Sequence, residues 1–134
     1  MQVFRTRWFA RFARQERISE ASLREAIARA ERGLIDADLG GGLIKQRVAR
    51  PGKGRSSGYR VIVAYRARNK AVFLLGFAKS ERENISTEEL TFLRQLAENW
   101  LAADAAKLRN EIQAGNLQEI KDDEETQHCI RSNS

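Results

Sequence analysis

The middle of the chain, from residue 39 to residue 80, is rich in basic side chains and contains no Asp or Glu. Its ten cations are Lys45, Arg47, Arg50, Lys53, Arg55, Arg60, Arg66, Arg68, Lys70 and Lys79. Protein faces that serve only solubility usually mix charges of both signs. An uncompensated run of positive charge is instead typical of a surface that binds a polyanion, above all a nucleic acid.

Cations at this density could also cleave RNA. Attack of a ribose 2′-hydroxyl on the adjacent phosphate needs a base for the hydroxyl, cations for the charge that develops on the phosphate, and an acid for the leaving 5′-oxygen. The only histidine, His128, lies in the polar C-terminal segment, and residues 39–80 offer no carboxylate cluster for metal ions. Lysine and arginine chemistry remains, because a lysine crowded by cations has a lowered pKa and arginine binds phosphate oxygens as a fork.

The catalytic candidates lie beside or within the strands expected in this region. They are Lys53, Arg60, Lys79 and Arg82. A second set, which we expect to hold the RNA backbone, comprises Lys45, Arg47, Arg50, Arg55 and Arg66. The pattern leaves open whether Lys53 or Lys79 acts as base or acid. It predicts neither a metal site nor a cofactor, because the glycines of residues 50–58 match neither a Walker A loop nor a dinucleotide fingerprint.

Length and composition bound the architecture. With 134 residues, 42% of them apolar, the chain fits one domain, which we expect over 1–121, followed by a polar, disordered tail over 122–134. Residues 1–110 carry 22 Lys and Arg against 12 Asp and Glu, whereas residues 111–134 carry 2 against 6. No apolar run is long enough to cross a membrane and the arginine-rich start does not resemble a signal peptide, so we expect a cytoplasmic protein.

Apolar periodicity predicts the elements that position the cations. Residues 1–6 are expected to form a strand and residues 7–15 a helix, because apolar side chains recur there at helical spacing. The apolar residues of this helix are Trp8, Phe9 and Phe12. Ser19 is the expected cap of a second helix that ends near Gly33. Residues 38–42, with three glycines, are expected to form a turn.

Strands are predicted next, at residues 43–49, 59–66 and 71–77. Their short connections favour an antiparallel sheet. In the middle strand the tyrosines and valines alternate with Arg60 and Arg66, which predicts one apolar face and one basic face. Its two tyrosines could stack a base, but their place among valines favours packing in the core.

Two helices and a short strand are expected after the sheet. Ser86 opens a long helix with a capping pattern and an apolar stripe that includes Trp100 as a core residue. A shorter helix at 104–113 and a short strand at 117–120 follow. The expected fold class is α+β, with an antiparallel sheet of three to four strands packed against two N-terminal helices and a C-terminal helix.

Three segments carry a family resemblance. They are GGGLIKQRVARPGKGRSSGYRVIVAYR at 40–66, FLLGFAKSERENIS at 73–86 and AGNLQEI at 114–120. In order and spacing they resemble the RelE/ParE superfamily of toxins from type II toxin–antitoxin systems, and more specifically its RelE-like, HigB-type subgroup, over about residues 1–120. The resemblance implies a ribosome-dependent mRNA endonuclease that inhibits translation and arrests growth, with Lys and Arg in place of catalytic His. It also implies a cognate antitoxin, the ribosome and mRNA as partners, and operator DNA bound through the antitoxin.

Three functions remain open at this point. The first is a ribosome-dependent mRNA endonuclease, also called an mRNA interferase. The second is a ParE-like inhibitor of DNA gyrase, which would not need a cation cluster on the sheet, and the third is a non-catalytic nucleic-acid-binding protein. For either toxin we expect the antitoxin to cover the basic sheet with an acidic segment that folds on binding.

Overall fold

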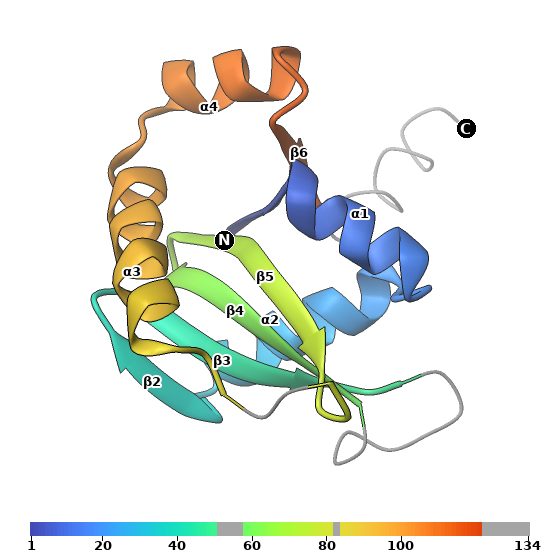
Figure 1. The fold of residues 1–134 in the computed structure, drawn as a ribbon. Helices are drawn as coiled ribbons and strands as arrows, with labels where there is room; N and C mark the ends of the chain where they lie inside the picture. Colours follow the sequence, from blue (N-terminus) through green and yellow to red (C-terminus); the bar gives the residue numbers. More distant parts are fainter. Residues whose placement is uncertain (51–57, 82–83, 122–134) are drawn as a thin grey trace.

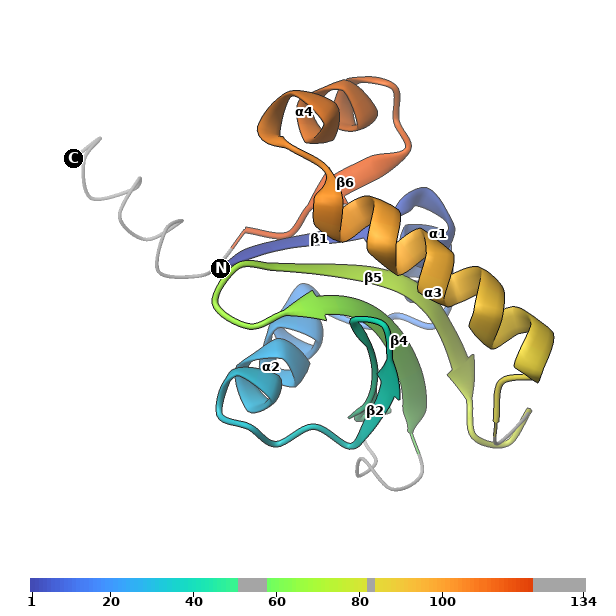
Figure 2. The same cartoon turned by 90° about the vertical axis from the view of Figure 1, so that its left-hand side faces the viewer.

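The computed structural model describes residues 1–50, 58–81 and 84–121, which form a central sheet with helices on both faces (Figure 1). The strands are β1 Gln2–Thr6, β2 Ala37–Gly40, β3 Leu43–Val48, β4 Tyr59–Arg66, β5 Lys70–Ala78 and β6 Leu117–Glu119. The helices are α1 Arg7–Gln15, α2 Glu20–Glu31, α3 Thr87–Ala102 and α4 Ala105–Gln113. Helices α1 and α2 pack on one face, α3 packs on the other, and α4 lies beside β6 (Figure 2).

The sheet is larger and more mixed than the sequence predicts. Its order is β2-β3-β4-β5-β1-β6, with every pair antiparallel except β1 and β5. The α+β class is confirmed, but the described part of the chain forms a sheet of six strands with one parallel pair, not three to four antiparallel strands. The second helix expected after the sheet is present as α4. Pairing between β1 and β5 joins segments far apart in the chain, so the local period-2 pattern carries no information about it.

The glycine turn is shorter than expected. Residues 37–40 form β2, and only Gly41 and Gly42 connect it to β3, with φ values of 64° and 82°. Left-handed backbone of this kind favours glycine, which has no Cβ to clash with the following carbonyl. The glycine-rich composition therefore indicates the turn correctly but hides the strand before it.

Local capping signals define the helix starts well. The Ser19 hydroxyl accepts from the Ser22 N–H at the start of α2. At the start of α3, Ser86 and Glu89 form a reciprocal capping box. These side chains satisfy backbone N–H groups that have no partner within the helix, so both predicted starts are confirmed.

Both faces of the sheet are buried, which corrects the expected division into an apolar and a basic face. Along β4, Val61 and Val63 pack under α1 and α2, whereas Ile62 and Ala64 pack under α3. Burial of one such valine or isoleucine is worth about 1.5–3 kcal/mol, so this strand lies at the centre of two cores. Cations remain only at its two ends.

The aromatic residues divide between core and surface. Phe9 stacks on Phe73 with ring centres 5.0 Å apart, and Tyr59 is buried as expected. Trp100 is partly buried and packs against the α3-side core, which agrees in part with its interpretation as a core residue. Trp8, despite its helical spacing with Phe12, is 74% exposed.

Two further expectations concern the C-terminal tail and the absence of a membrane-spanning segment. The predicted tail over 122–134 lies outside the described residues. Within the described part of the chain, no helix combines the length and the apolar character that a membrane span requires.

Candidate nucleic-acid interface and catalytic cations

Cations from three adjacent strands meet at one end of the sheet, where β3 and β5 end and β4 begins (Figure 1). Arg47 lies directly opposite Arg60, and Arg60 lies opposite Phe77 on its other side. Residues paired in this way point to the same face, here the α3 side to which Phe77 belongs. Lys79 follows β5 at the same end, where its backbone N–H donates to the Gly58 carbonyl at 3.4 Å. The structure therefore brings Arg60 and Lys79 to one end of the sheet, with Arg47 beside them.

Arg60 is the member of this group with an unusual environment. Its Nη1 atom is buried and has no hydrogen-bond partner among the described residues. Leaving a buried polar donor unpaired costs about 1–3 kcal/mol, so native proteins rarely tolerate it without a functional reason. Arg60 therefore places an unsatisfied donor at this end of the sheet.

Arg47 is held in place by contacts with two residues from outside its strand, Asp36 and Arg29. Its backbone N–H donates to Oδ2 of Asp36 at 2.7 Å, and its guanidinium lies 3.4 Å from Oδ1. Arg29, which is buried, donates to the same carboxylate and to the Arg47 carbonyl. Burial raises the pKa of Asp36, but the hydrogen bonds and charges of Arg47 and Arg29 outweigh it and hold this pKa below its ordinary value. The Arg47 side chain is still 47% exposed, so it can contact a ligand from a rigid base.

The sequence pattern does not single out Asp36. The available signal is its position, because it is one of two carboxylates directly before the acid-free stretch. Its contact with Arg47 depends on strand β2, which the glycine-rich composition hides.

Arg50 lies on the other face of the sheet from Arg60. Its guanidinium sits over the Tyr59 ring, 5.5 Å from the ring centre, and the Tyr59 hydroxyl donates to Glu16 at 2.9 Å. Burial, followed by the hydrogen bond to Glu16, raises the pKa of Tyr59. The pair anchors the end of β3 to α1, and the buried Tyr59 ring is not free to stack a base.

Arg66 lies at the far end of β4 from Arg60, where it meets Lys70 and the end of α3. The Lys70 ammonium donates to the carbonyls of Ala103 at 2.6 Å and Trp100 at 3.0 Å, and Arg66 donates to the Leu101 carbonyl at 3.2 Å. Carbonyls at a helix C-terminus lack intrahelical partners and carry partial negative charge. These two cations therefore stabilise α3, a role that spacing along β4 does not indicate.

The other predicted site residues are placed only in part. Lys45 is partly buried on β3, opposite Ile62 on the α3 side, and Lys79 is exposed. Lys53, Arg55 and Arg82 lie outside the described residues.

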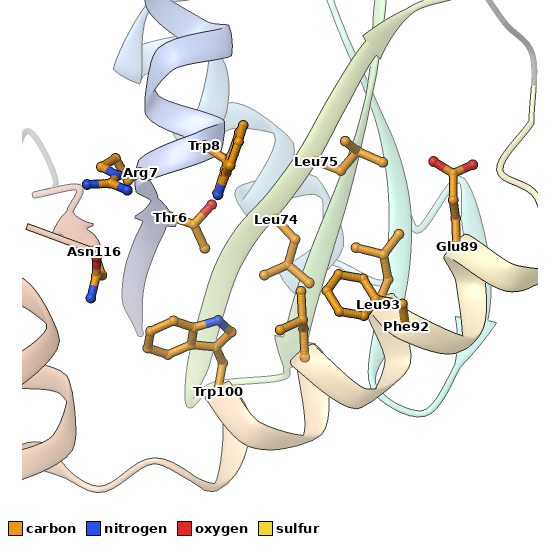
Figure 3. Close-up of a pocket in the computed structure, with 11 residues that line it drawn as sticks. Thr6, Arg7, Trp8, Leu74, Leu75, Glu89, Phe92, Leu93, Trp100 and Asn116 are labelled. Atoms are coloured by element: carbon orange, nitrogen blue, oxygen red, sulfur yellow. The ribbon is translucent and has the colours of Figure 1, made fainter.

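An apolar groove of about 570 Å³ lies between the start of α1 and helix α3, beside the end of the sheet where Arg60 and Lys79 lie (Figure 3). Its lining includes Leu74 and Leu75 on β5, with Trp8 on one side and Phe92 on the other. Phe92 is 60% exposed. The sequence pattern does not predict the groove. The one available signal is that Phe92 lies outside the apolar stripe predicted for its helix, which consists of Leu90, Leu93, Ala97, Trp100 and Leu101.

The sheet covered on both faces and the cation cluster at its end define a small, basic α+β protein. A sequence model of the family described as the RelE toxin of the RelE/RelB toxin–antitoxin system matches residues 1–120. The chain therefore belongs to the RelE toxin family. Membership makes it the toxin of a toxin–antitoxin module with an antitoxin partner, in a family whose toxins are generally translation-inhibiting mRNA endonucleases. No curated protein matches the chain.

Proposed function

We propose that this toxin is a ribosome-dependent mRNA endonuclease of the HigB type that acts without a metal ion. The main support is the meeting of Arg47, Arg60 and Lys79 at one end of the sheet, with a buried Arg60 nitrogen that lacks a partner among the described residues. Arginine binds phosphate oxygens through charge-assisted hydrogen bonds, which are stronger than neutral ones. The cluster therefore suits a phosphate that gains negative charge during reaction.

The proposed reaction is a transesterification within the mRNA. The 2′-oxygen forms a bond to phosphorus as its proton moves to a base, and the bond from phosphorus to the 5′-oxygen breaks as that oxygen takes a proton from an acid. The products are a 2′,3′-cyclic phosphate and a 5′-hydroxyl. Arg60 would stabilise the charge on the phosphate, and Lys79 or Lys53 would transfer a proton.

The remaining cations would hold RNA and not react with it. Arg47 and Lys45 lie on β3 next to Arg60 and would contact the phosphate backbone of mRNA or ribosomal RNA. We assign Arg82 to the catalytic set and Arg55 to RNA binding from the sequence alone. Arg50 and Arg66 are weaker candidates, because their guanidinium groups already contact Tyr59 and the end of α3.

The proposal implies the cellular setting of the toxin. Cleavage on translating ribosomes would take place in the cytoplasm, and the toxin–antitoxin complex would bind operator DNA through the antitoxin. Neither is needed for the chemistry, so both can be tested separately from cleavage.

The test is a translation reaction assembled from purified components, with and without ribosomes, read by primer extension on the mRNA. Wild-type toxin is expected to produce cuts only with ribosomes, Arg60→Ala to abolish them, and Arg109→Ala, an exposed arginine on α4, to leave them unchanged. Intact mRNA together with broken DNA in treated cells would favour gyrase inhibition. Binding without cleavage would favour a nucleic-acid-binding protein.

A further inference from the structure

The apolar groove exists because neighbouring strands end at different points. Strand β1 pairs with β5 only as far as Phe73 and ends at Thr6, whereas β5 continues to Ala78. Helix α1 turns away at Arg7, so among the described residues no strand lies beside the last part of β5 on that side. Helix α3 forms the other wall, which leaves the groove open between them (Figure 3).

The groove exposes more apolar surface than its structural role explains. Trp8 and Phe92, on its two walls, are the two most exposed of the large apolar side chains in the described residues. Scattered apolar side chains are normal on protein surfaces, but aromatic residues around a concave apolar floor mark interaction sites. The floor and walls are formed mainly by Trp8, Leu74, Leu75, Phe92, Leu93, Leu96 and Trp100.

The rim of the groove on the α1 side is positively charged. Arg7 lines the groove, and the Arg11 guanidinium lies 5.7 Å from the centre of the Trp8 ring. Both arginines are exposed, α1 contains no carboxylate, and neither arginine forms an ion pair within the described part of the chain. The α1 side of the groove therefore complements a ligand that carries carboxylates beside its apolar side chains, whereas Glu89 lines the groove on the α3 side.

We propose that the groove receives the neutralising segment of the antitoxin, an acidic amphipathic segment whose apolar side chains fill the groove while its carboxylates meet Arg7 and Arg11. The proposal rests on the chain acting as a toxin held by an antitoxin. An amphipathic segment in an apolar groove is a common mode of peptide recognition. RNA fits less well, because protein–nucleic acid interfaces are strongly polar and the floor of this groove is apolar.

Occupation of the groove would also obstruct the cation cluster. Leu75 lines the groove and lies two residues before Phe77, the partner of Arg60 across the β4–β5 pair. Two residues along a strand span about 7 Å. A segment in the groove would therefore lie beside the path of an mRNA phosphate to Arg60, without covering the basic sheet itself, whose centre is already covered by α3.

The experiment is calorimetric titration of the purified toxin with the protein encoded by the adjacent reading frame, and with overlapping peptides that tile it. Trp8→Ala with Phe92→Ala is expected to weaken binding by at least about tenfold, as loss of buried aromatic anchors does. Leu34→Ala, a matched change at an exposed leucine outside the groove, is expected to leave affinity unchanged. Arg7→Glu with Arg11→Glu is expected to weaken binding more at about 0.1 M salt than at about 1 M salt.

Growth and cleavage assays distinguish this proposal from the proposed function. The Trp8/Phe92 double variant should still cut mRNA on ribosomes and arrest growth, and co-expression of the antitoxin should no longer rescue the cells. Unchanged antitoxin affinity in that variant, with its fold verified by circular dichroism, would overturn the groove assignment. Full antitoxin affinity combined with lost cleavage would overturn it too, and would instead assign the groove to the ribosome. Neither binding result depends on whether the toxin cleaves RNA.

Discussion

Arg47 and Arg60 lie directly opposite each other on adjacent strands, so two permanent positive charges share one position of the sheet. Like charges placed in this way destabilise a sheet by roughly 0.2–1 kcal/mol. Asp36 offsets part of the charge of Arg47, whereas Nη1 of Arg60 has no partner among the described residues. The repulsion would be relieved by an anion between the two side chains, which links this local cost in stability to phosphate binding.

Arg60→Ala should separate activity from stability. We expect cleavage on ribosomes to fall by about 100-fold or more, the usual effect of removing one donor to a charged transition state. The free energy of unfolding should change by no more than about 1 kcal/mol, because relief of repulsion offsets the lost packing of the side-chain stem. Primer extension and urea denaturation measure the two effects. Lys79→Ala should also lose activity, and growth arrest by both variants would show that neither residue carries the chemistry.

Asp36→Asn should destabilise the sheet edge in a pH-dependent manner. The carboxylate accepts from the Arg47 backbone and from the Arg29 guanidinium, so its loss should lower the free energy of unfolding by about 1–2 kcal/mol at pH 7. Because the pKa of Asp36 is lowered in the folded state, its contribution is present above the unfolded pKa. It is lost as the pH falls through the folded value, so wild type and variant should converge below about pH 4.

Asp38→Asn is the control for that comparison. Asp38 is an exposed carboxylate two residues further along, on β2, and its side chain accepts a hydrogen bond from the nearby Gly40 N–H, which an asparagine can keep. Its unfolding curve should stay close to wild type at every pH. An equal effect of both substitutions would mean that net charge, not the contact with Arg47, determines the pH dependence.

Local sequence signals were sufficient to predict most helices and strands, but not the contacts that the candidate site residues make with distant parts of the chain. The caps Ser19 and Ser86 act within one helical turn, so they can be read from neighbouring residues. The hairpin that brings Arg60 near Lys79 is also local. The side on which Arg50 lies depends on packing of Tyr59 against α1, and the contacts of Arg66 depend on where α3 ends. Such long-range contacts have no signature in the spacing of one strand.

Lys70→Met should weaken the fold without reducing catalysis. Its ammonium donates to carbonyls at the end of α3, and the side chain is only 5% exposed, so we expect the free energy of unfolding to fall by about 1–3 kcal/mol. Arg66→Met, which removes one such bond from an exposed residue, should cost about 0.5–1 kcal/mol. Urea denaturation gives both values. If either folded variant loses cleavage on ribosomes, that cation belongs to RNA binding and not only to α3.

Gly76→Ala should disturb the contact between β5 and α1. A Cβ at this position would lie 2.2 Å from a ring carbon of Phe12, well inside van der Waals contact. Overpacking of this kind costs about 1–3 kcal/mol. Phe12→Ala in the same chain should remove the clash, so a double-mutant cycle should show a favourable coupling energy of at least about 0.5 kcal/mol. Additive effects of the two substitutions would contradict the proposed contact.

Dependence on the ribosome follows from the chemistry of the cation cluster. Lysine has an ordinary pKa of about 10.4, so a site that relies on it for proton transfer is slow at neutral pH unless the substrate is held in a reactive geometry. A ribosome that aligns the 2′-oxygen, the phosphorus and the 5′-oxygen could supply several kcal/mol, since positioning is worth up to about 7–11 kcal/mol. We therefore expect purified toxin to leave free mRNA largely intact. The same mRNA on translating ribosomes should be cut within the codon in the A site. The cleavage step should not require a divalent metal bound by the toxin, which can be checked by treating the toxin with a chelator and removing the chelator before the toxin is added to mRNA-loaded ribosomes, with Arg60→Ala as the inactive control. Rapid digestion of naked RNA, or loss of cutting when only the metal bound by the toxin is removed, would contradict this mechanism.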